Sequence, residues 1–231
     1  MVAALACACL WTVPAAAEPA VSSTDTAGSY EATLNRASGE VSVEYAAAPG
    51  VRKPARAGTG LSAKDVVRTG KNGRAEIALV NYGLIELQPN ATMVINSLEK
   101  ADASFTLRLG ALLSKLRSLG GRRLRVRSSR AVASVRGTEF AVEAKGDGAA
   151  AYFAVFDEGV VDVEAEGHPA VTLESNLETA VRPGEAPAAP HAIDHFKFAQ
   201  QRMRILRQRA RYFGDQWHRK YRIPKTRGAK P

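Results

Sequence analysis

The sequence predicts an all-β domain followed by a basic amphipathic helix, and three observations support this prediction. First, short runs of alternating or β-branched residues recur at intervals of about ten residues, the spacing expected of an all-β fold. Second, Gly, Pro, Asn and Asp separate these runs, as they do in turns. Third, apolar residues near the C-terminus follow a three-and-four spacing, which is typical of a helix with one apolar face.

The predicted β-domain spans residues 34–184. Its strands are expected at 41–45, 75–80, 84–87, 92–95, 105–109, 124–126, 140–143, 151–156, 160–164 and 171–173. Residues 109–119 are ambiguous between strand and short helix. Alternation predicts which side chains face the core (Phe140, Val142, Val155, Val161 and Val163) and which face water (Glu139, Glu143, Asp162 and Glu164). Periodicity alone leaves a sandwich, a barrel and a rolled solenoid open.

The N-terminal residues predict export. Residues 1–17 carry no charge and end in three alanines after an apolar run, as in a signal peptide. Residues 18–33 are expected to be a disordered lead-in. Both cysteines lie at positions 7 and 9, so the mature protein is expected to contain no disulfide. Acylation of one of these cysteines is an alternative, although the apolar run before them is short.

The C-terminal part of the chain is expected to be a linker at 185–192, a helix at 193–222 and a disordered tail at 223–231. The linker is rich in Pro and Ala, and Asp194 is the candidate N-cap of the helix. From His191 onward there are twelve Lys and Arg against two Asp, a net charge of +10, whereas the whole chain carries +9. The excess positive charge therefore belongs to the tail. The expected apolar face consists of Phe196, Ala199, Met203, Leu206, Ala210, Phe213 and Trp217.

Two glycine-containing motifs are the most specific local signals. The first reads Thr-Gly-Lys-Asn-Gly-Arg at 69–74, and the second reads Val-Arg-Gly-Thr-Glu-Phe at 135–140. With the Gly-containing segments at 39–43 and 158–163, they resemble the FecR domain, over residues 39–184. The resemblance implies short strands wound into a β-roll or solenoid-like domain. The motif positions are expected to be mainly structural: Gly73, Arg74, Arg136, Gly137, Thr138, Glu139 and Gly159.

The resemblance also implies a role in signalling. In regulators of this family, the domain receives a signal from an outer-membrane transporter and relays it through a membrane helix to a sigma factor. Here a signal peptide stands where the cytoplasmic and membrane parts would be, so only the binding role is carried over. We therefore expect a protein-binding, signalling or scaffold module that is exported to the periplasm or cell envelope.

Two groups of basic residues are candidate contacts for an anion or a partner. Alternation predicts that Arg123, Arg125 and Arg127 share one strand face, where an anion site and a simple solvated face are equally compatible with the pattern. The helix contributes Arg202, Arg207, Arg209, Arg211 and Trp217. The helix could cap the β-domain, self-associate, lie on an anionic membrane or bind an envelope polymer, and of these capping is favoured. Nucleic acid is not an expected partner.

The sequence predicts no enzymatic activity. It contains no serine elbow, phosphate loop or metalloprotease helix, and both cysteines lie in the signal peptide. We predict no catalytic residue, no cofactor and no metal; His191 and His195, four residues apart, are expected to be solvated. The alternative is a β-roll that binds or cleaves envelope polysaccharide. Its aromatic candidates are scattered along the chain: Tyr82, Phe105, Tyr152, Phe153 and Phe156.

Overall fold

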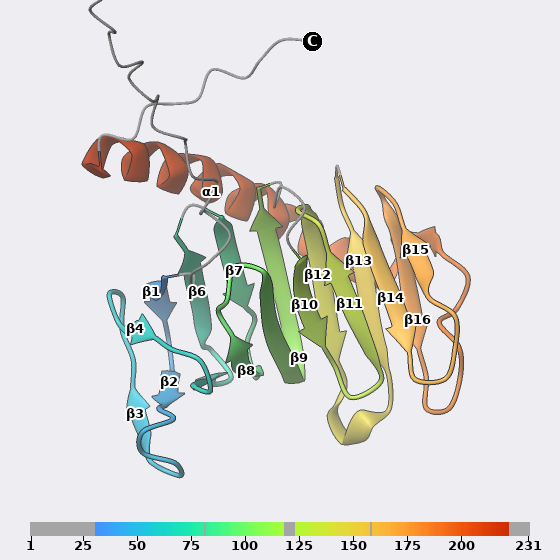
Figure 1. Cartoon of the computed structure of the whole chain (residues 1–231), viewed down its shortest axis with the longest axis horizontal. Coiled ribbons are helices and arrows are strands. Elements are labelled where there is room, and N and C mark those ends of the chain that lie inside the picture. Colours follow the sequence, from blue (N-terminus) through green and yellow to red (C-terminus); the bar gives the residue numbers. More distant parts are fainter. Residues whose placement is uncertain (1–30, 81, 118–122, 158, 222–231) are drawn as a thin grey trace, which may run out of the picture.

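The computed structural model describes residues 31–80, 82–117, 123–157 and 159–221. The predicted signal peptide, all but the last residues of the lead-in, and the predicted tail lie outside these ranges. The described residues form seventeen strands joined in one mixed sheet, with one long helix at the C-terminal end (Figure 1). The all-β prediction with a C-terminal helix is therefore confirmed. The sheet is open, and the closer description as a roll or solenoid stays a prediction.

The sheet is folded into two layers that share one long strand, β9 (Asp102–Leu116). The first, here called the helix-covered layer, contains nine strands including the second half of β9. Their spatial order is β4 (Gly60–Leu61), β1 (Ala32–Ser38), β6 (Arg74–Leu79), β7 (Gly83–Leu87), β9, β12 (Glu139–Ala144), β13 (Ala151–Val155), β16 (Leu177–Val181) and β17 (His191–Ala192).

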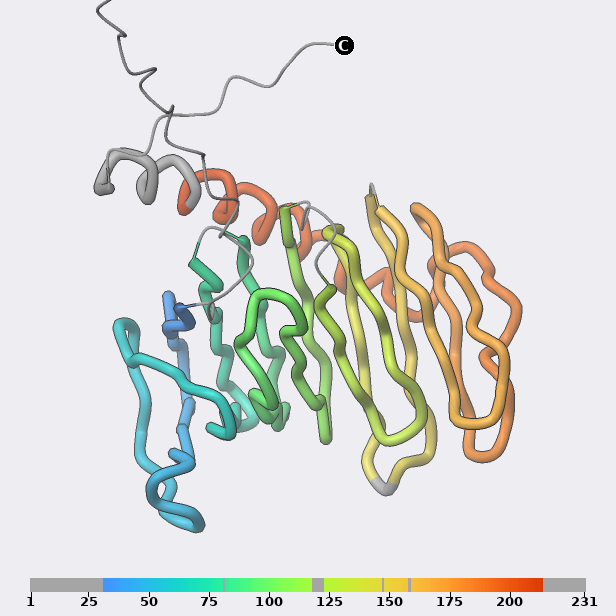
Figure 2. The backbone as a smooth tube through the Cα atoms, in the orientation of Figure 1, coloured from blue at the N-terminus to red at the C-terminus, as the bar shows by residue number. Residues whose placement is uncertain are grey.

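The second, here called the open layer, contains the first half of β9. Its spatial order is β3 (Arg52–Pro54), β2 (Val41–Glu44), β5 (Val66–Thr69), β8 (Thr92–Ser97), β9, β10 (Arg123–Arg127), β11 (Ala131–Val135), β14 (Val161–Ala165) and β15 (Val171–Leu173). Among the described pairings, β9 and β10 are the one parallel pair; the others are antiparallel. The chain crosses repeatedly between the layers, as the tube in Figure 2 shows.

Strand β9 resolves the ambiguity of residues 109–119. Its residues up to Leu109 pair in the open layer with β8 and β10, and those from Gly110 pair in the helix-covered layer with β7 and β12. The change of layer coincides with the exposed residues Arg108 and Leu109. The segment is therefore a strand as far as Leu116, and residues 118–122 lie outside the described ranges.

The main core lies between the two layers. Its largest fully buried side chains include Phe105, Phe140 and Phe153, which come from both layers. All five residues predicted to face the core are buried there: Phe140, Val142, Val155, Val161 and Val163. Asp162 and Glu164 lie on the outer face of the open layer, with Asp162 half-buried and Glu164 exposed, as alternation predicts.

The helical part begins with a short 3-10 turn, η2 (His195–Ala199), and continues as α1 (Gln200–Tyr221). A second 3-10 turn, η1 (Gly146–Gly148), joins β12 to β13. α1 runs across the strands rather than along them (Figure 1). The structure differs from the predicted linker at its end, because residues 191–192 pair with β16 as strand β17. Among the described residues, no helix is long and apolar enough to cross a membrane.

Candidate functional site

The apolar face of α1 packs on the outer face of the helix-covered layer and forms a second core. Phe196, Ala199, Met203 and Leu206 are at most 1% exposed in this cluster. The sheet side consists of Ala78, Leu84, Leu113, Ala141, Ala154 and Phe156. Of the predicted helix face, Ala210 and Phe213 are partly buried, and the side chain of Trp217 lies outside the described part. The helix thus covers the β-domain, the alternative that the sequence favoured.

Buried carboxylates lie beside this apolar cluster on the same sheet face. Glu76, Glu86, Glu139 and Glu178 are each at most 3% exposed and come from four different strands. This corrects the prediction that Glu139 faces water; Glu143 is also only 15% exposed. Alternation identified the outer face correctly, but the outer face here is covered by the helix. An ionised carboxylate is costly to bury unless a cation pairs with it.

Arginines of α1 supply these cations. Arg207 donates from Nε and Nη2 to the two carboxylate oxygens of Glu139, at 2.6 and 2.5 Å. Arg202 donates in the same bidentate way to Glu86, at 2.5 and 2.7 Å. Such paired bonds fix the guanidinium plane as well as its charge, so they set the position of the helix on the sheet.

Arg209 lies between two carboxylates. Its Nη1 is 3.0 Å from Glu76 Oε2 and 3.7 Å from Glu86 Oε2. The hydrogen bond with Glu86 raises the pKa of Arg202, and the hydrogen bond with Glu139 raises the pKa of Arg207, in each case against the opposing effect of burial. Both side chains therefore stay charged, because a free guanidinium is already protonated at physiological pH.

The role of these arginines differs from the expectation that they contact an external anion. Arg202, Arg207 and Arg209 are occupied by carboxylates of the same chain. Arg204 and Arg211, by contrast, are exposed. The sequence showed the apolar stripe but not the acceptors, which come from strands more than sixty residues earlier.

The start of the helix is held by a carboxylate from the sheet rather than by its predicted N-cap. Glu178 accepts hydrogen bonds from the backbone N–H groups of His195, at 2.8 Å, and Phe196, at 3.2 Å. These are donors that a helix leaves unpaired at its first turn. Asp194 makes no capping bond and instead pairs with Lys197. His195 is not solvated as expected: its ring stacks on Tyr152, and Nε2 lies 2.5 Å from Glu143.

The Val-Arg-Gly-Thr-Glu-Phe motif sets the local backbone conformation and also contacts the helix. Gly137 has a φ of +107°, a conformation that side chains disfavour. Thr138 is buried, and its Cβ lies within 2.3 Å of where a Cβ on Gly159 would stand. Arg136 is largely exposed, and its Nη2 is 3.4 Å from Asp162 rather than bonded to Glu139. The motif glutamate, Glu139, binds Arg207 and Lys115.

The other glycine motif brings two backbone segments into contact. A Cβ at Gly73 would stand 2.0 Å from the carbonyl oxygen of Glu40, so only glycine fits. Arg74, at the start of β6, is exposed, and its Nε is 3.4 Å from Gln88 Oε1.

Replacement of Gly73 by Ala is expected to lower the free energy of unfolding by about 3 kcal/mol, because overpacking against a backbone atom can be relieved only by moving the strand. Urea denaturation followed by circular dichroism would measure this change. Gly58→Ala is unsuitable as a control because its φ is positive, whereas Gly60→Ala has no atom within 4 Å of the added methyl and an ordinary φ. An equal loss in both variants would contradict the steric explanation.

The arginines of β10 lie on the outer face of the open layer, as alternation predicts. Arg123 and Arg127 are exposed and Arg125 is half-buried between them. Arg125 forms an ion pair with Asp102 of β9, and the two flank a shallow cavity of about 350 Å³ with Arg123. Arg123 and Arg127 make no ion pair with another described residue. The structure thus brings the three arginines together on a face that no described element covers.

Comparison with known proteins places this fold. Residues 65–162 match the FecR protein family. Two crystal structures of a protein named "putative anti-sigma factor" from Parabacteroides distasonis ATCC 8503 have a similar fold, each with a TM-score of 0.51 and 16% sequence identity. The alignment covers 58% of this chain and 62% of that chain, less than two thirds of its length. None of the curated proteins matches. The matched segment runs from the loop before β5 into β14 and includes both glycine motifs, so residues 65–162 are the part of the chain that is similar to the FecR family.

Proposed function

We propose that this protein is an exported, non-enzymatic regulatory module that binds another cell-envelope protein through the outer face of its open layer. The FecR domain supports a role in signalling. The signal-peptide pattern of residues 1–17 supports export, with the periplasm or the envelope surface as its location. The two Parabacteroides structures, named as a putative anti-sigma factor, share this fold.

The observation that carries the proposal is the difference between the two outer faces of the domain. One face is closed by α1, whose arginines are neutralised by the sheet. The other presents Arg123 and Arg127 without an ion-pair partner among the described residues, beside the small side chain of Ser134 on the neighbouring strand. Unpaired surface cations of this kind favour a partner with an acidic segment. The helix therefore completes the fold of the β-domain, and the outer face of the open layer binds the partner protein.

The distribution of aromatic side chains gives the polysaccharide alternative no support. Phe105 and Phe153 are buried between the layers, and Phe156 lies under the helix. Tyr152 is stacked on His195. These side chains are therefore not free to form the exposed platform on which a sugar ring would stack.

The ion pairs between α1 and the sheet bear on whether the helix attaches the protein to an anionic surface. Of the four helix arginines that the sequence proposed for this role, the described structure leaves Arg211 exposed. Attachment through the docked face of the helix would require the ion pairs with the sheet to break. We therefore propose capping of the β-domain as the function of α1.

Crosslinking in the native host would test the partner surface. A photoreactive residue at position 134, opposite Arg125 on the neighbouring strand β11, should give one specific adduct with an acidic segment, identified by mass spectrometry. The Arg123→Glu/Arg127→Glu variant should reduce that adduct at least tenfold, because its charge is reversed. A photoreactive residue at Gln208, exposed on α1, is the matched control and should not give this adduct. The proposal fails if both positions yield the same adducts or if charge reversal leaves the adduct unchanged.

A further inference from the structure

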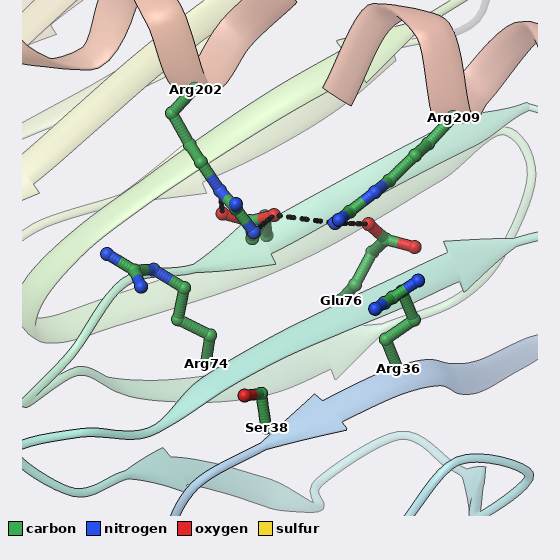
Figure 3. A pocket seen from close by; sticks show the side chains of 7 residues that line it. Arg36, Ser38, Arg74, Glu76, Arg202 and Arg209 are labelled. Carbon is green, nitrogen blue, oxygen red and sulfur yellow. Dashed lines mark hydrogen bonds and ion pairs between the residues drawn. The ribbon is translucent and has the colours of Figure 1, made fainter. Parts of the chain in front are cut away.

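A second positively charged site lies where α1 meets the edge of the helix-covered layer. The cavity there has a volume of about 200 Å³ and is lined by seven residues of β1, β6, β7 and α1: Arg36, Ser38, Arg74, Glu76, Glu86, Arg202 and Arg209 (Figure 3). Figure 3 shows Arg36 and Arg74 on the sheet below the two helix arginines. The cavity is on the opposite side of the domain from the arginines of β10, so it lies outside the partner surface proposed above.

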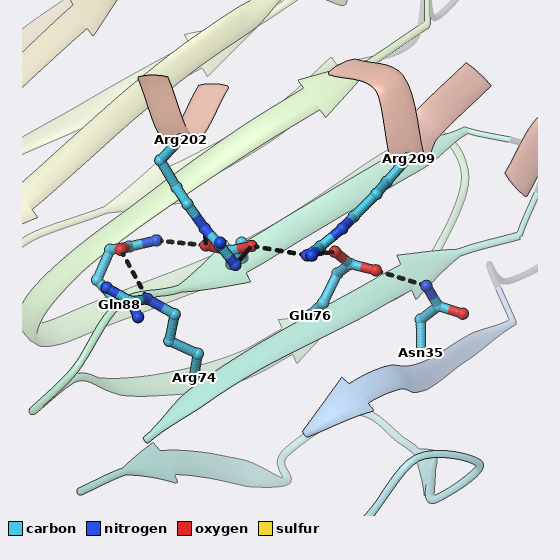
Figure 4. A network of polar contacts seen from close by, with 7 residues as sticks. Asn35, Arg74, Glu76, Gln88, Arg202 and Arg209 are labelled. Atoms are coloured by element: carbon cyan, nitrogen blue, oxygen red, sulfur yellow. Dashed lines mark hydrogen bonds and ion pairs between the residues drawn. The ribbon is translucent and has the colours of Figure 1, made fainter. Parts of the chain in front are cut away.

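The two carboxylates of the cavity already have their partners. Glu86 accepts from Arg202 and from Gln88 Nε2, the latter at 2.8 Å. Glu76 accepts from Asn35 Nδ2, at 2.5 Å, and from Arg209, at 3.0 Å (Figure 4). Each carboxylate therefore already has a guanidinium of α1 and a side-chain amide of the sheet region as partners.

Two of the four guanidiniums remain without a carboxylate. The side chain of Arg36 makes no hydrogen bond or ion pair with another described residue. The side chain of Arg74 makes one long hydrogen bond, to the neutral side chain of Gln88. With two carboxylates against four arginines, the cavity carries a net charge of +2. Ser38 adds a hydroxyl that can donate to an acceptor oxygen.

We propose that this cavity binds a dianionic phosphate group, either free phosphate or the phosphomonoester of a larger molecule. A phosphate carries a charge of about −1.5 to −2 at neutral pH, which matches the excess of two cations. Guanidinium groups bind the oxygens of phosphate in a bidentate manner, whereas a carboxylate offers one plane of acceptors and a single charge. The cavity is smaller than the roughly 300–1,000 Å³ of drug-sized sites, which suits one phosphate group.

Phosphate at this position would join the helix to the sheet. Arg36 and Arg74 belong to β1 and β6, while Arg202 and Arg209 belong to α1. An anion held between the two sheet arginines and the two helix arginines binds the protein only while α1 is docked on the sheet. By mass action, phosphate should therefore raise the melting temperature of the protein.

The test is calorimetric titration of the full-length chain with inorganic phosphate, with chloride at equal ionic strength as the reference. The Arg36→Gln/Arg74→Gln variant should bind phosphate at least tenfold more weakly than the unmodified protein. Arg204→Gln/Arg211→Gln removes the same charge from exposed positions of α1 and should bind within twofold of the unmodified protein. Circular dichroism without phosphate establishes that each variant is folded, and none of the four residues contributes to the ion pairs that hold the helix.

Vesicles distinguish the two sources of the phosphate group. Phosphatidic acid exposes a phosphomonoester, and phosphatidylglycerol vesicles of equal surface charge expose only diesters. If the ligand is a lipid, the protein should bind phosphatidic acid vesicles more tightly than phosphatidylglycerol vesicles, and the Arg36→Gln/Arg74→Gln variant should lose this preference. If the ligand is free phosphate, the protein should bind phosphate but show no preference between the two kinds of vesicle. The proposal is overturned if phosphate binds no more tightly than chloride, or if the two double variants lose equal affinity.

Discussion

Removal of residues 195–231 is expected to leave a protein that is unfolded or aggregated rather than a free β-domain. Fully burying each of Phe196, Met203 and Leu206 stabilises the fold by about 2 kcal/mol, and a domain of this kind has about 5–15 kcal/mol in total. The truncation also leaves Glu86 and Glu139 without their bidentate partners. Circular dichroism, gel filtration and urea denaturation of the truncated protein would measure the loss.

Deletion of residues 222–231 alone is the matched control for this truncation. This deletion keeps η2, the buried face of α1 and the ion pairs of Arg202 and Arg207, so the urea midpoint should stay unchanged. If the protein lacking 195–231 remained monomeric with the midpoint of the full chain, the helix would be an appendage on the sheet rather than part of its core.

Replacement of Glu139 by Ala is the point substitution with the largest expected effect. Glu139 is completely buried and accepts from both Arg207 and Lys115, so its loss removes the partner of Lys115 and leaves Arg207 only its ion pair with Asp157, at 3.1 Å. Breaking a buried ion pair by removing one partner typically costs about 3–5 kcal/mol. Urea denaturation of the single variants, and of Glu139→Ala/Arg207→Ala, would give the coupling energy between the two residues.

Glu164 provides the control for Glu139, because it is an exposed glutamate on the outer face of the open layer. Glu164→Ala should change stability by no more than about 0.5 kcal/mol, as is usual for surface positions. Replacement of both Glu139 and Arg207 by Leu should recover part of the loss, since an apolar pair avoids the cost of burying those two charges, while Lys115, 28% exposed, loses its partner. Additive effects of Glu139→Ala and Arg207→Ala would show that the two side chains are not coupled.

Each predicted run overlaps a strand of the structure because the inner face of the two layers follows simple alternation, whereas β1, β5, β11 and β16 were not among the predicted runs. Phe140, Val142 and Val163 face the core as their period-two pattern requires. The glycine motifs likewise predicted turns. Gly137 has a positive φ and Gly73 lies against the backbone of Glu40, and both positions favour glycine over other residues. The inward-facing residues and the turns depend on local sequence alone, so both can be predicted from one amino-acid sequence.

The helix-covered face was harder to predict because its partner is distant in sequence. Glu76 and Glu86 alternate with apolar residues, a pattern that resembles a solvated sheet face. A signal did exist: in β7, Leu84 and Ile85 point to opposite faces and both are apolar, as in strands buried on two sides. Which arginine would meet which glutamate depends on how α1 crosses the strands, and periodicity carries no information on that.

Strand β9 has a consequence for how the chain folds. Among the described strand pairings, β1 to β8 pair only with one another and with β9, and β10 to β17 likewise. Each half of the sequence can therefore form its strand pairings without the other half. The halves become one cooperative unit when β9 has found its neighbours on both sides, and α1 then spans the seam, with Arg202 on the first half and Arg207 on the second.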